Sequence, residues 1–176
     1  MNIVLCGFMG CGKTTVGRMT ARRLGIDFVD MDVYIEQQAG MTVSEIFASK
    51  GESAFRRMET EAARQLSERN NLMIATGGGT VLNPENVALL KRNGVIVLLQ
   101  VSPETVLWRL RNNNTRPLLQ RPDKEAAVRT LMAERTPVYK NAAGIILSAN
   151  MPSGQVAAQL SHLAKKYIDK QVGLVL

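Results

Sequence analysis

Short apolar runs alternate along the chain with longer stretches in which apolar residues recur every three or four positions. The short runs predict five strands, whose nearly continuous apolar character is typical of a parallel sheet covered on both faces. The predicted strands are residues 2–6, 28–30, 72–76, 95–100 and 144–147. The periodic stretches predict helices at residues 13–24, 32–68, 83–93, 102–111, 124–140 and 153–170. Strands that alternate with helices in this way indicate an α/β fold of three layers.

Two segments depart from this alternation. About forty residues separate the second predicted strand from the third, which is too long for one crossover helix and predicts an inserted helical subdomain. The segment NNNTRPLLQRPD, residues 112–123, is polar and holds two prolines, so we expect a mobile flap there.

Composition narrows the class of protein. At 176 residues, 45% of them hydrophobic, the chain is long enough for one domain with a substantial core. It has no apolar run near the ~20 residues that span a bilayer, and its start lacks the basic segment of a signal peptide. We therefore expect a cytoplasmic protein that binds no membrane. A single histidine argues against a zinc site, and Cys6 and Cys11 are expected to be reduced thiols.

The formal net charge of +7 is compatible with nucleic-acid binding or with an anionic small substrate. The basic residues form no cluster of five, and only 5% of the residues are aromatic. We expect no nucleic-acid partner.

Residues 7–14, GFMGCGKT, match the pattern G-x-x-x-x-G-K-[ST], with a predicted strand before them and a predicted helix after them. In such a P-loop the glycines let backbone N–H groups point at phosphate oxygens, and the helix amino terminus adds its positive dipole end. Lys13 is expected to reach the β- and γ-phosphates, and the Thr14 hydroxyl to ligate Mg²⁺. The sequence therefore predicts a site for a nucleoside triphosphate.

Two carboxylates, Asp30 and Asp32, follow the second predicted strand, at the strand end where open α/β sheets bind ligands. Because residues i and i+2 on extended backbone point the same way, both can face the site. One can serve the water shell of the metal and the other the acceptor hydroxyl, or the two can simply cap a helix start. With the only histidine at position 162, carboxylates are the candidate proton acceptors.

The inserted region combines aromatic and cationic side chains, at Phe47 and in FRRME, residues 55–59. Arg56 and Glu59, three positions apart on a helix, can form a charge pair that orients the guanidinium as a carboxylate clamp. Three glycines, residues 77–79, follow the third predicted strand and can bring backbone N–H groups to a ligand. Taken alone, these features also suit a solvated helix face and a tight turn.

The ordered series GFMGCGKTT, FVDMD, GESAFRRME, ATGGG, RPLL and ERTPVYK resembles the shikimate kinase family over nearly the whole chain. The resemblance implies a P-loop fold like that of nucleoside-monophosphate kinases, with a five-stranded parallel sheet in the order 2-3-1-4-5 and helices on both faces. It implies transfer of the γ-phosphate of ATP to the 3-hydroxyl of shikimate, on the route through chorismate to the aromatic amino acids. One kinase domain would span residues 1–176, with a substrate-binding helical region at about 32–61 and a lid at about 112–122.

Carried over position by position, the resemblance also implies roles for single residues. Asp32 would meet the ring hydroxyls and accept a proton, and Arg116 would close over the nucleotide. Thr14, and Asp30 through water, would hold Mg²⁺. The implied catalytic residues are Lys13, Asp32 and Arg116. The implied ATP-binding residues are Gly10, Cys11, Gly12, Lys13, Thr14, Thr15 and Arg116. The implied shikimate-binding residues are Asp32, Phe47, Phe55, Arg56, Gly77, Gly78, Gly79 and Arg135.

Other activities are compatible with parts of this pattern. Gluconate kinase and nucleoside-monophosphate kinases are the nearest alternatives among enzymes, and a non-catalytic ATP-binding switch or a nucleic-acid-binding ATPase is the alternative outside that class. Ring-sized apolar walls and two carboxylate arginines favour shikimate, and a switch is expected to lack a complete acceptor site. We expect a monomer whose partners are shikimate and ATP.

Overall fold

The computed structural model, which describes residues 1–111 and 123–172, contains one sheet of five parallel strands. The strands are β1 (Asn2–Cys6), β2 (Asp27–Asp30), β3 (Leu72–Ala75), β4 (Gly94–Gln100) and β5 (Ile145–Ser148). They lie in the order β2-β3-β1-β4-β5, which confirms the predicted order, and each predicted strand end is within one residue of the observed one.

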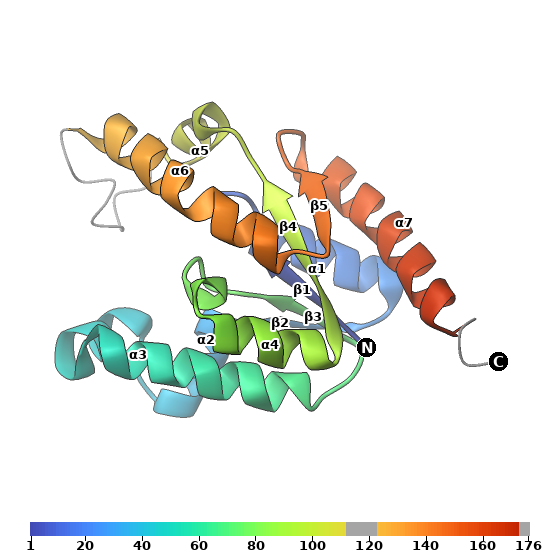
Figure 1. Cartoon of the computed structure of the whole chain (residues 1–176), viewed down its shortest axis with the longest axis horizontal. Helices are drawn as coiled ribbons and strands as arrows, with labels where there is room; N and C mark the ends of the chain where they lie inside the picture. Colours follow the sequence, from blue (N-terminus) through green and yellow to red (C-terminus); the bar gives the residue numbers. More distant parts are fainter. Residues whose placement is uncertain (112–122, 173–176) are drawn as a thin grey trace.

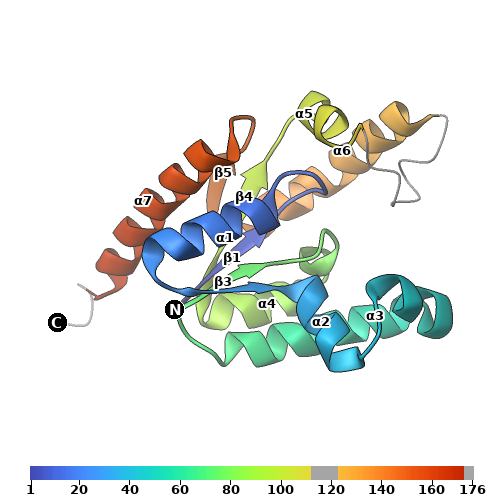
Figure 2. The same ribbon diagram turned by 180° about the vertical axis from the view of Figure 1, so that it is seen from behind.

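The predicted helices are present, and the long region between β2 and β3 divides into two of them. The helices are α1 (Lys13–Leu24), α2 (Met31–Ala39), α3 (Val43–Ser67), the short 3-10 helix η1 (Thr80–Leu82), α4 (Pro84–Arg92), α5 (Pro103–Arg109), α6 (Lys124–Ala142) and α7 (Ser153–Val172). Helices α1 and α7 pack together on one face of the sheet, while α4 and α6 cover the other and α3 lies alongside α4 (Figures 1 and 2). The predicted three-layer arrangement is therefore confirmed.

Local signals in the sequence explain how the inserted region folds. Helix α2 ends at Gly40, which has a φ of 63°, a left-handed conformation that favours glycine. Helix α3 then begins with a capping box, in which the Thr42 side chain accepts from the N–H of Glu45 and the Glu45 carboxylate accepts from the N–H of Thr42. Gly51, with φ 79° and ψ 170°, kinks α3 after its second turn. The kink separates the part of α3 that carries Phe47 from the part that carries Arg56.

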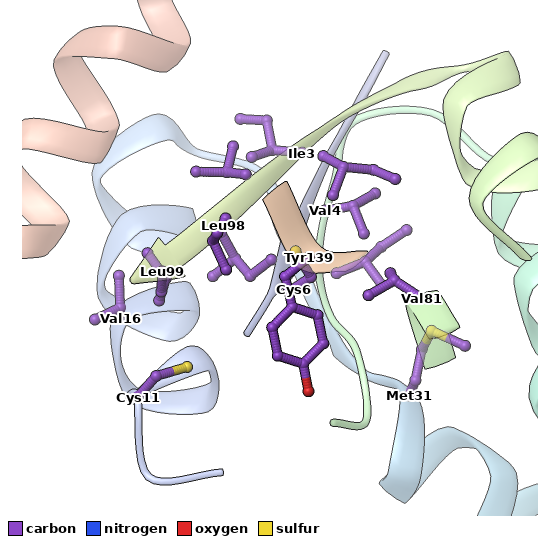
Figure 3. Packing of buried hydrophobic residues seen from close by; sticks show 14 of the residues in the cluster. Ile3, Val4, Cys6, Cys11, Val16, Met31, Val81, Leu98, Leu99 and Tyr139 are labelled. Carbon is purple, nitrogen blue, oxygen red and sulfur yellow. The ribbon is translucent and has the colours of Figure 1, made fainter. Parts of the chain in front are cut away.

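The core lies on both sides of β1 and β4, whose side chains are almost all buried, as expected for central parallel strands. Figure 3 shows side chains from these strands packed with Val16 and Met31. Cys6 and Cys11 are free and buried, and burial raises the pKa of the Cys6 thiol to about 12. Over the described ranges, no helix combines the length and the apolar character needed to cross a membrane.

Candidate active site

The functional candidates gather at one edge of the sheet, because parallel strands place all their carboxyl ends there. A cavity of about 470 Å³ lies at this edge, between the P-loop, the end of β2 and the turn that follows β3. Its lining consists of Met9, Gly10, Gly12, Lys13, Thr14, Thr15, Asp30, Asp32, Thr76, Gly77, Gly78, Arg109, Leu110 and Ser153. The fold thus brings the predicted triphosphate site and the two predicted carboxylates into one cleft.

The P-loop adopts the conformation that its glycines permit. Gly10 has a φ of 75° and Gly12 a φ of 99°, and Gly12 directly precedes the first turn of α1. The Lys13 ammonium folds back over the loop and donates hydrogen bonds to the carbonyl oxygens of Gly7 at 2.8 Å and Phe8 at 3.2 Å. Lys13 therefore spans the concave side of the loop, where a phosphate chain would compete for its protons.

The predicted magnesium ligands are in contact. Thr14 Oγ1 donates to Asp30 Oδ2 at 2.7 Å, while Asp30 Oδ1 accepts from the N–H of Asp32 and caps α2. Asp30 therefore caps α2, one of the two roles that its position suggested, and its other carboxylate oxygen faces Thr14 of the P-loop. Among the described residues no group of three or more His, Cys, Asp or Glu side chains could hold a metal. A hydroxyl and one carboxylate fit Mg²⁺, which takes oxygen ligands and keeps several waters.

Asp32 lies in the cleft against the turn formed by residues 77–79, which we call the glycine loop. A Cβ atom built on Gly77 would lie 2.8 Å from Asp32 Oδ1 and 3.0 Å from Glu59 Oε1. The glycine loop can approach both carboxylates only because it carries no side chain there.

The predicted ion pair of Arg56 and Glu59 is present. Arg56 Nη1 donates to Glu59 Oε2 at 2.7 Å, and its Nε and Nη2 atoms donate to Glu52 Oε1. Glu59 is only 1% exposed, and its other oxygen, Oε1, accepts from Thr80 Oγ1 at 2.6 Å. Burial acts to lower the pKa of Arg56, but the hydrogen bonds and charges of the two glutamates outweigh it and raise that pKa. Arg56 is thus a permanently charged guanidinium with a fixed orientation.

Two aromatic rings stand next to this arginine. Phe47 and Phe55 approach each other across the kink of α3, with ring centroids 4.9 Å apart. Phe55 is 4% exposed, whereas Phe47 is 37% exposed. The Arg56 guanidinium lies 5.7 Å from the Phe55 ring centroid, and its atoms lie against Gly79. One ring therefore belongs to the core, and the other is an exposed apolar surface beside the cationic group.

Arg135 lies on α6, one helical turn before Tyr139. Four positions further along this helix, Tyr139 is buried and its hydroxyl donates to the carbonyl oxygen of Gly78 at 2.7 Å. Burial raises the pKa of this phenol, while the charge and the hydrogen bonding of Arg135 act in the opposite direction. The spacing of four positions places the two side chains on one face of α6. Within the described part of the chain, neither Arg56 nor Arg135 lines the cavity itself. Arg56 lies against Gly79 of the glycine loop, and Arg135 shares a face of α6 with Tyr139, which bonds to Gly78 of that loop.

The structure also places a residue in the cleft that the sequence had not singled out. Arg109, at the end of α5, donates from Nη1 to the carbonyl oxygens of Gly10 and Cys11, at 3.2 and 3.1 Å. Its Nη2 atom donates to the carbonyl oxygens of Ala149 and Met151, at 2.7 and 3.3 Å. The four acceptors are backbone atoms far away in the sequence, so no residue pattern marks them. The predicted lid at 112–122 and its Arg116 lie outside the described residues.

Comparisons with known proteins agree on one family. The family model described as "Shikimate kinase" matches residues 9–165. The shikimate kinase of Caldicellulosiruptor saccharolyticus is 46% identical over 168 residues, covering 94% of this chain and 97% of the relative. The shikimate kinase of Pelotomaculum thermopropionicum is 45% identical, with 94% and 96% covered. The solved structure of the shikimate kinase from Acinetobacter baumannii in complex with shikimate has a TM-score of 0.87 and 38% identity, with 94% of this chain and 93% of that chain covered.

Proposed function

Since this chain belongs to the shikimate kinase family, we propose that its cleft transfers the γ-phosphate of ATP to the 3-hydroxyl of shikimate, on the route through chorismate to the aromatic amino acids. The observation that carries this proposal is the juxtaposition, in one cleft, of a P-loop lysine and a carboxylate that faces the glycine loop. The first group suits a triphosphate donor and the second a hydroxyl acceptor.

On the donor side, we assign the triphosphate to the P-loop, with backbone N–H groups of residues 10–15 around the β- and γ-phosphates. Lys13 exchanges its bonds to Gly7 and Phe8 for bonds to phosphate oxygens, which are stronger because both partners are then charged. Its charge stays near the oxygens on which negative charge accumulates as the phosphoryl group moves. Thr14 and, through water, Asp30 hold Mg²⁺, which when bound neutralises phosphate charge.

On the acceptor side, we assign the carboxylate of shikimate to Arg56 and Arg135 and its ring to the apolar surface of Phe47 and Phe55. Arg56 is suited to this because Glu52 and Glu59 hold its fork in place before a substrate arrives. Asp32, which lines the cleft within reach of the P-loop, holds the 3-hydroxyl and accepts its proton during transfer. The glycine loop contributes backbone N–H groups to the same substrate.

A coupled assay of ADP release tests this proposal, with shikimate, gluconate and AMP supplied in parallel. We expect turnover with shikimate and rates at the ATPase background with the other two acceptors. Turnover with gluconate or AMP that equals or exceeds turnover with shikimate would contradict the proposal, and ADP release independent of any acceptor would favour an ATPase.

We further propose that the enzyme acts as a cytoplasmic monomer. All the groups assigned to ATP and shikimate come from one chain, so the site needs no second copy. The molecular mass by sedimentation, with and without both substrates, tests the monomer, and localisation of the tagged full chain in cell fractions tests the compartment.

A further inference from the structure

The glycine loop is held from two sides by buried side chains. On the α3 side, Glu59 accepts from Thr80, which directly follows the loop, and also from Arg56. Both bonds are short, at 2.6 and 2.7 Å, and Glu59 is 1% exposed. This carboxylate therefore fixes the position of one arginine relative to the loop.

On the α6 side, Tyr139 makes the corresponding connection. Its hydroxyl donates to the carbonyl oxygen of Gly78 at 2.7 Å, and Arg135 lies four positions earlier on α6, so its side chain projects from the same face of the helix. We infer that Tyr139 is a positioning residue, which fixes Arg135 relative to the glycine loop and so sets the distance between the two carboxylate-binding guanidinium groups. The inference rests on the proposed assignment of Arg135 to the shikimate carboxylate.

The geometry of the tyrosine suits this function. Tyr139 is 2% exposed, and Figure 3 shows its ring next to Cys6, with the hydroxyl oxygen pointing away from Ile3 and Val4. The place of that oxygen is therefore set by packing rather than by solvent. A hydroxyl donates one hydrogen bond and accepts two, so donation to Gly78 leaves its lone pairs for a donor such as Arg135.

Holding the Arg135 guanidinium and the N–H of Gly79 in place before shikimate arrives lowers the entropic cost of binding it. An arginine side chain loses rotational freedom when it is held, and a fixed acceptor removes part of that freedom before the substrate arrives. Because a trans peptide is planar, holding the carbonyl of Gly78 also fixes the direction of the N–H of Gly79. One hydroxyl thus orders a side-chain donor and a backbone donor of the same acceptor site.

Tyr139→Phe tests the inference, because it removes the hydroxyl and keeps the ring. We expect kcat/KM for shikimate to fall about 5- to 30-fold, mainly through KM, which is the range for one lost hydrogen bond near a charged group. The KM for ATP is expected to stay unchanged. Tyr34→Phe is the matched control, since the Tyr34 hydroxyl donates to Gln65 Oε1 over the same 2.7 Å at the α2–α3 interface. A similar shift of the melting temperature in both variants, with the shikimate effect in Tyr139→Phe alone, supports positioning over a general structural role.

A double-mutant cycle that combines Tyr139→Phe with Arg135→Ala tests whether Tyr139 acts through Arg135. If Tyr139 acts mainly through Arg135, Tyr139→Phe lowers kcat/KM for shikimate by a smaller factor in the Arg135→Ala background than in the wild type, and the remaining effect reports the N–H of Gly79. The inference is overturned if the two effects multiply, or if Tyr139→Phe leaves kcat/KM unchanged while Arg135→Ala lowers it. An Arg135→Ala enzyme with unaltered kcat/KM overturns the assignment of Arg135 itself, and this inference with it.

Discussion

The P-loop and the acceptor half of the cleft hold their cationic groups in different ways. Lys13 donates to carbonyl oxygens of Gly7 and Phe8, six and five positions before it in the same loop. Arg56 is held by two carboxylates, and the buried one, Glu59, is bonded in turn to Thr80, 21 positions away. Lys13 is thus held locally by neutral partners, while Arg56 belongs to an ionic network that joins α3 to η1.

This difference predicts different consequences of mutation. The bonds of Lys13 to carbonyl groups are replaced when phosphate binds, so they contribute little to the folded state. The bonds of Arg56 neutralise a carboxylate inside the protein, where an unpaired charge is costly. Changes in the donor half should therefore lower activity without lowering stability, and changes in the acceptor half should lower both.

The largest effect is expected from Lys13→Ala. It removes a positive charge from the phosphates in the transition state, so kcat should fall about 10²- to 10³-fold. The free energy of unfolding, measured by urea denaturation, should change by less than about 0.5 kcal/mol. Lys140→Ala, which removes an exposed lysine of α6, is the control for loss of charge. More than about a tenth of the wild-type turnover in Lys13→Ala would contradict this role.

Variants of the two carboxylates after β2 should differ in how their activity depends on the Mg²⁺ concentration. Asp32→Asn removes the proton acceptor and should lower kcat about 10²-fold at any Mg²⁺ concentration. Asp30→Asn keeps a helix cap, because asparagine also caps, but weakens the metal site. Its activity should recover as Mg²⁺ is raised in a steady-state titration. If Mg²⁺ rescues Asp32→Asn and not Asp30→Asn, the two assignments are exchanged.

Arg56→Ala should lower kcat/KM for shikimate about 10- to 100-fold, because a charge-assisted contact to the substrate is lost. It should also lower the free energy of unfolding by about 1–3 kcal/mol, less than for a fully buried pair because the Arg56 side chain is 38% exposed. Binding of ATP should be nearly unaffected. Titration of each ligand and urea denaturation provide the measurements.

Two further variants sharpen this test. Arg57 is the next residue along α3, and its side chain is exposed. Arg57→Ala should therefore change kcat/KM for shikimate and the free energy of unfolding very little. In Arg56→Ala/Glu59→Gln the buried charge is removed together with its partner, so stability should partly recover while shikimate binding stays weak. Equal losses of ATP and shikimate affinity in Arg56→Ala would mean that the two halves are not separate.

The smallest effect is expected from Phe47→Ala. The ring is 37% exposed and contacts Phe55, so its loss should lower kcat/KM for shikimate less than about tenfold and cost at most ~1 kcal/mol of stability. Phe55→Ala is the comparison, because this ring is 4% exposed and its removal should cost about 3 kcal/mol or more. Equal stability losses in the two variants would show that Phe47 is a core residue.

Residues whose function depends on near neighbours could be predicted from the sequence. The P-loop is one contiguous motif, and the Arg56–Glu59 pair follows from a helical spacing of three. Residues whose partners lie far away in the sequence could not be predicted in this way. Tyr139 bonds to a residue 61 positions away, and Arg109 to residues 99 and 98 positions away. The partners of Tyr139 and Arg109 are backbone carbonyl groups, which every residue type has, so their side-chain types carry no signal.

By itself, the sequence determined the alternation of strands and helices and the phosphate loop after β1. These depend on side-chain periodicity and on bonds between residues a few positions apart. The tertiary structure decided how α3 and α6 are placed around the glycine loop, and hence where Arg56 and Arg135 lie relative to each other. That distance depends on the packing of side chains far apart in the chain, such as Tyr139 in the core, and packing is a property of the folded molecule.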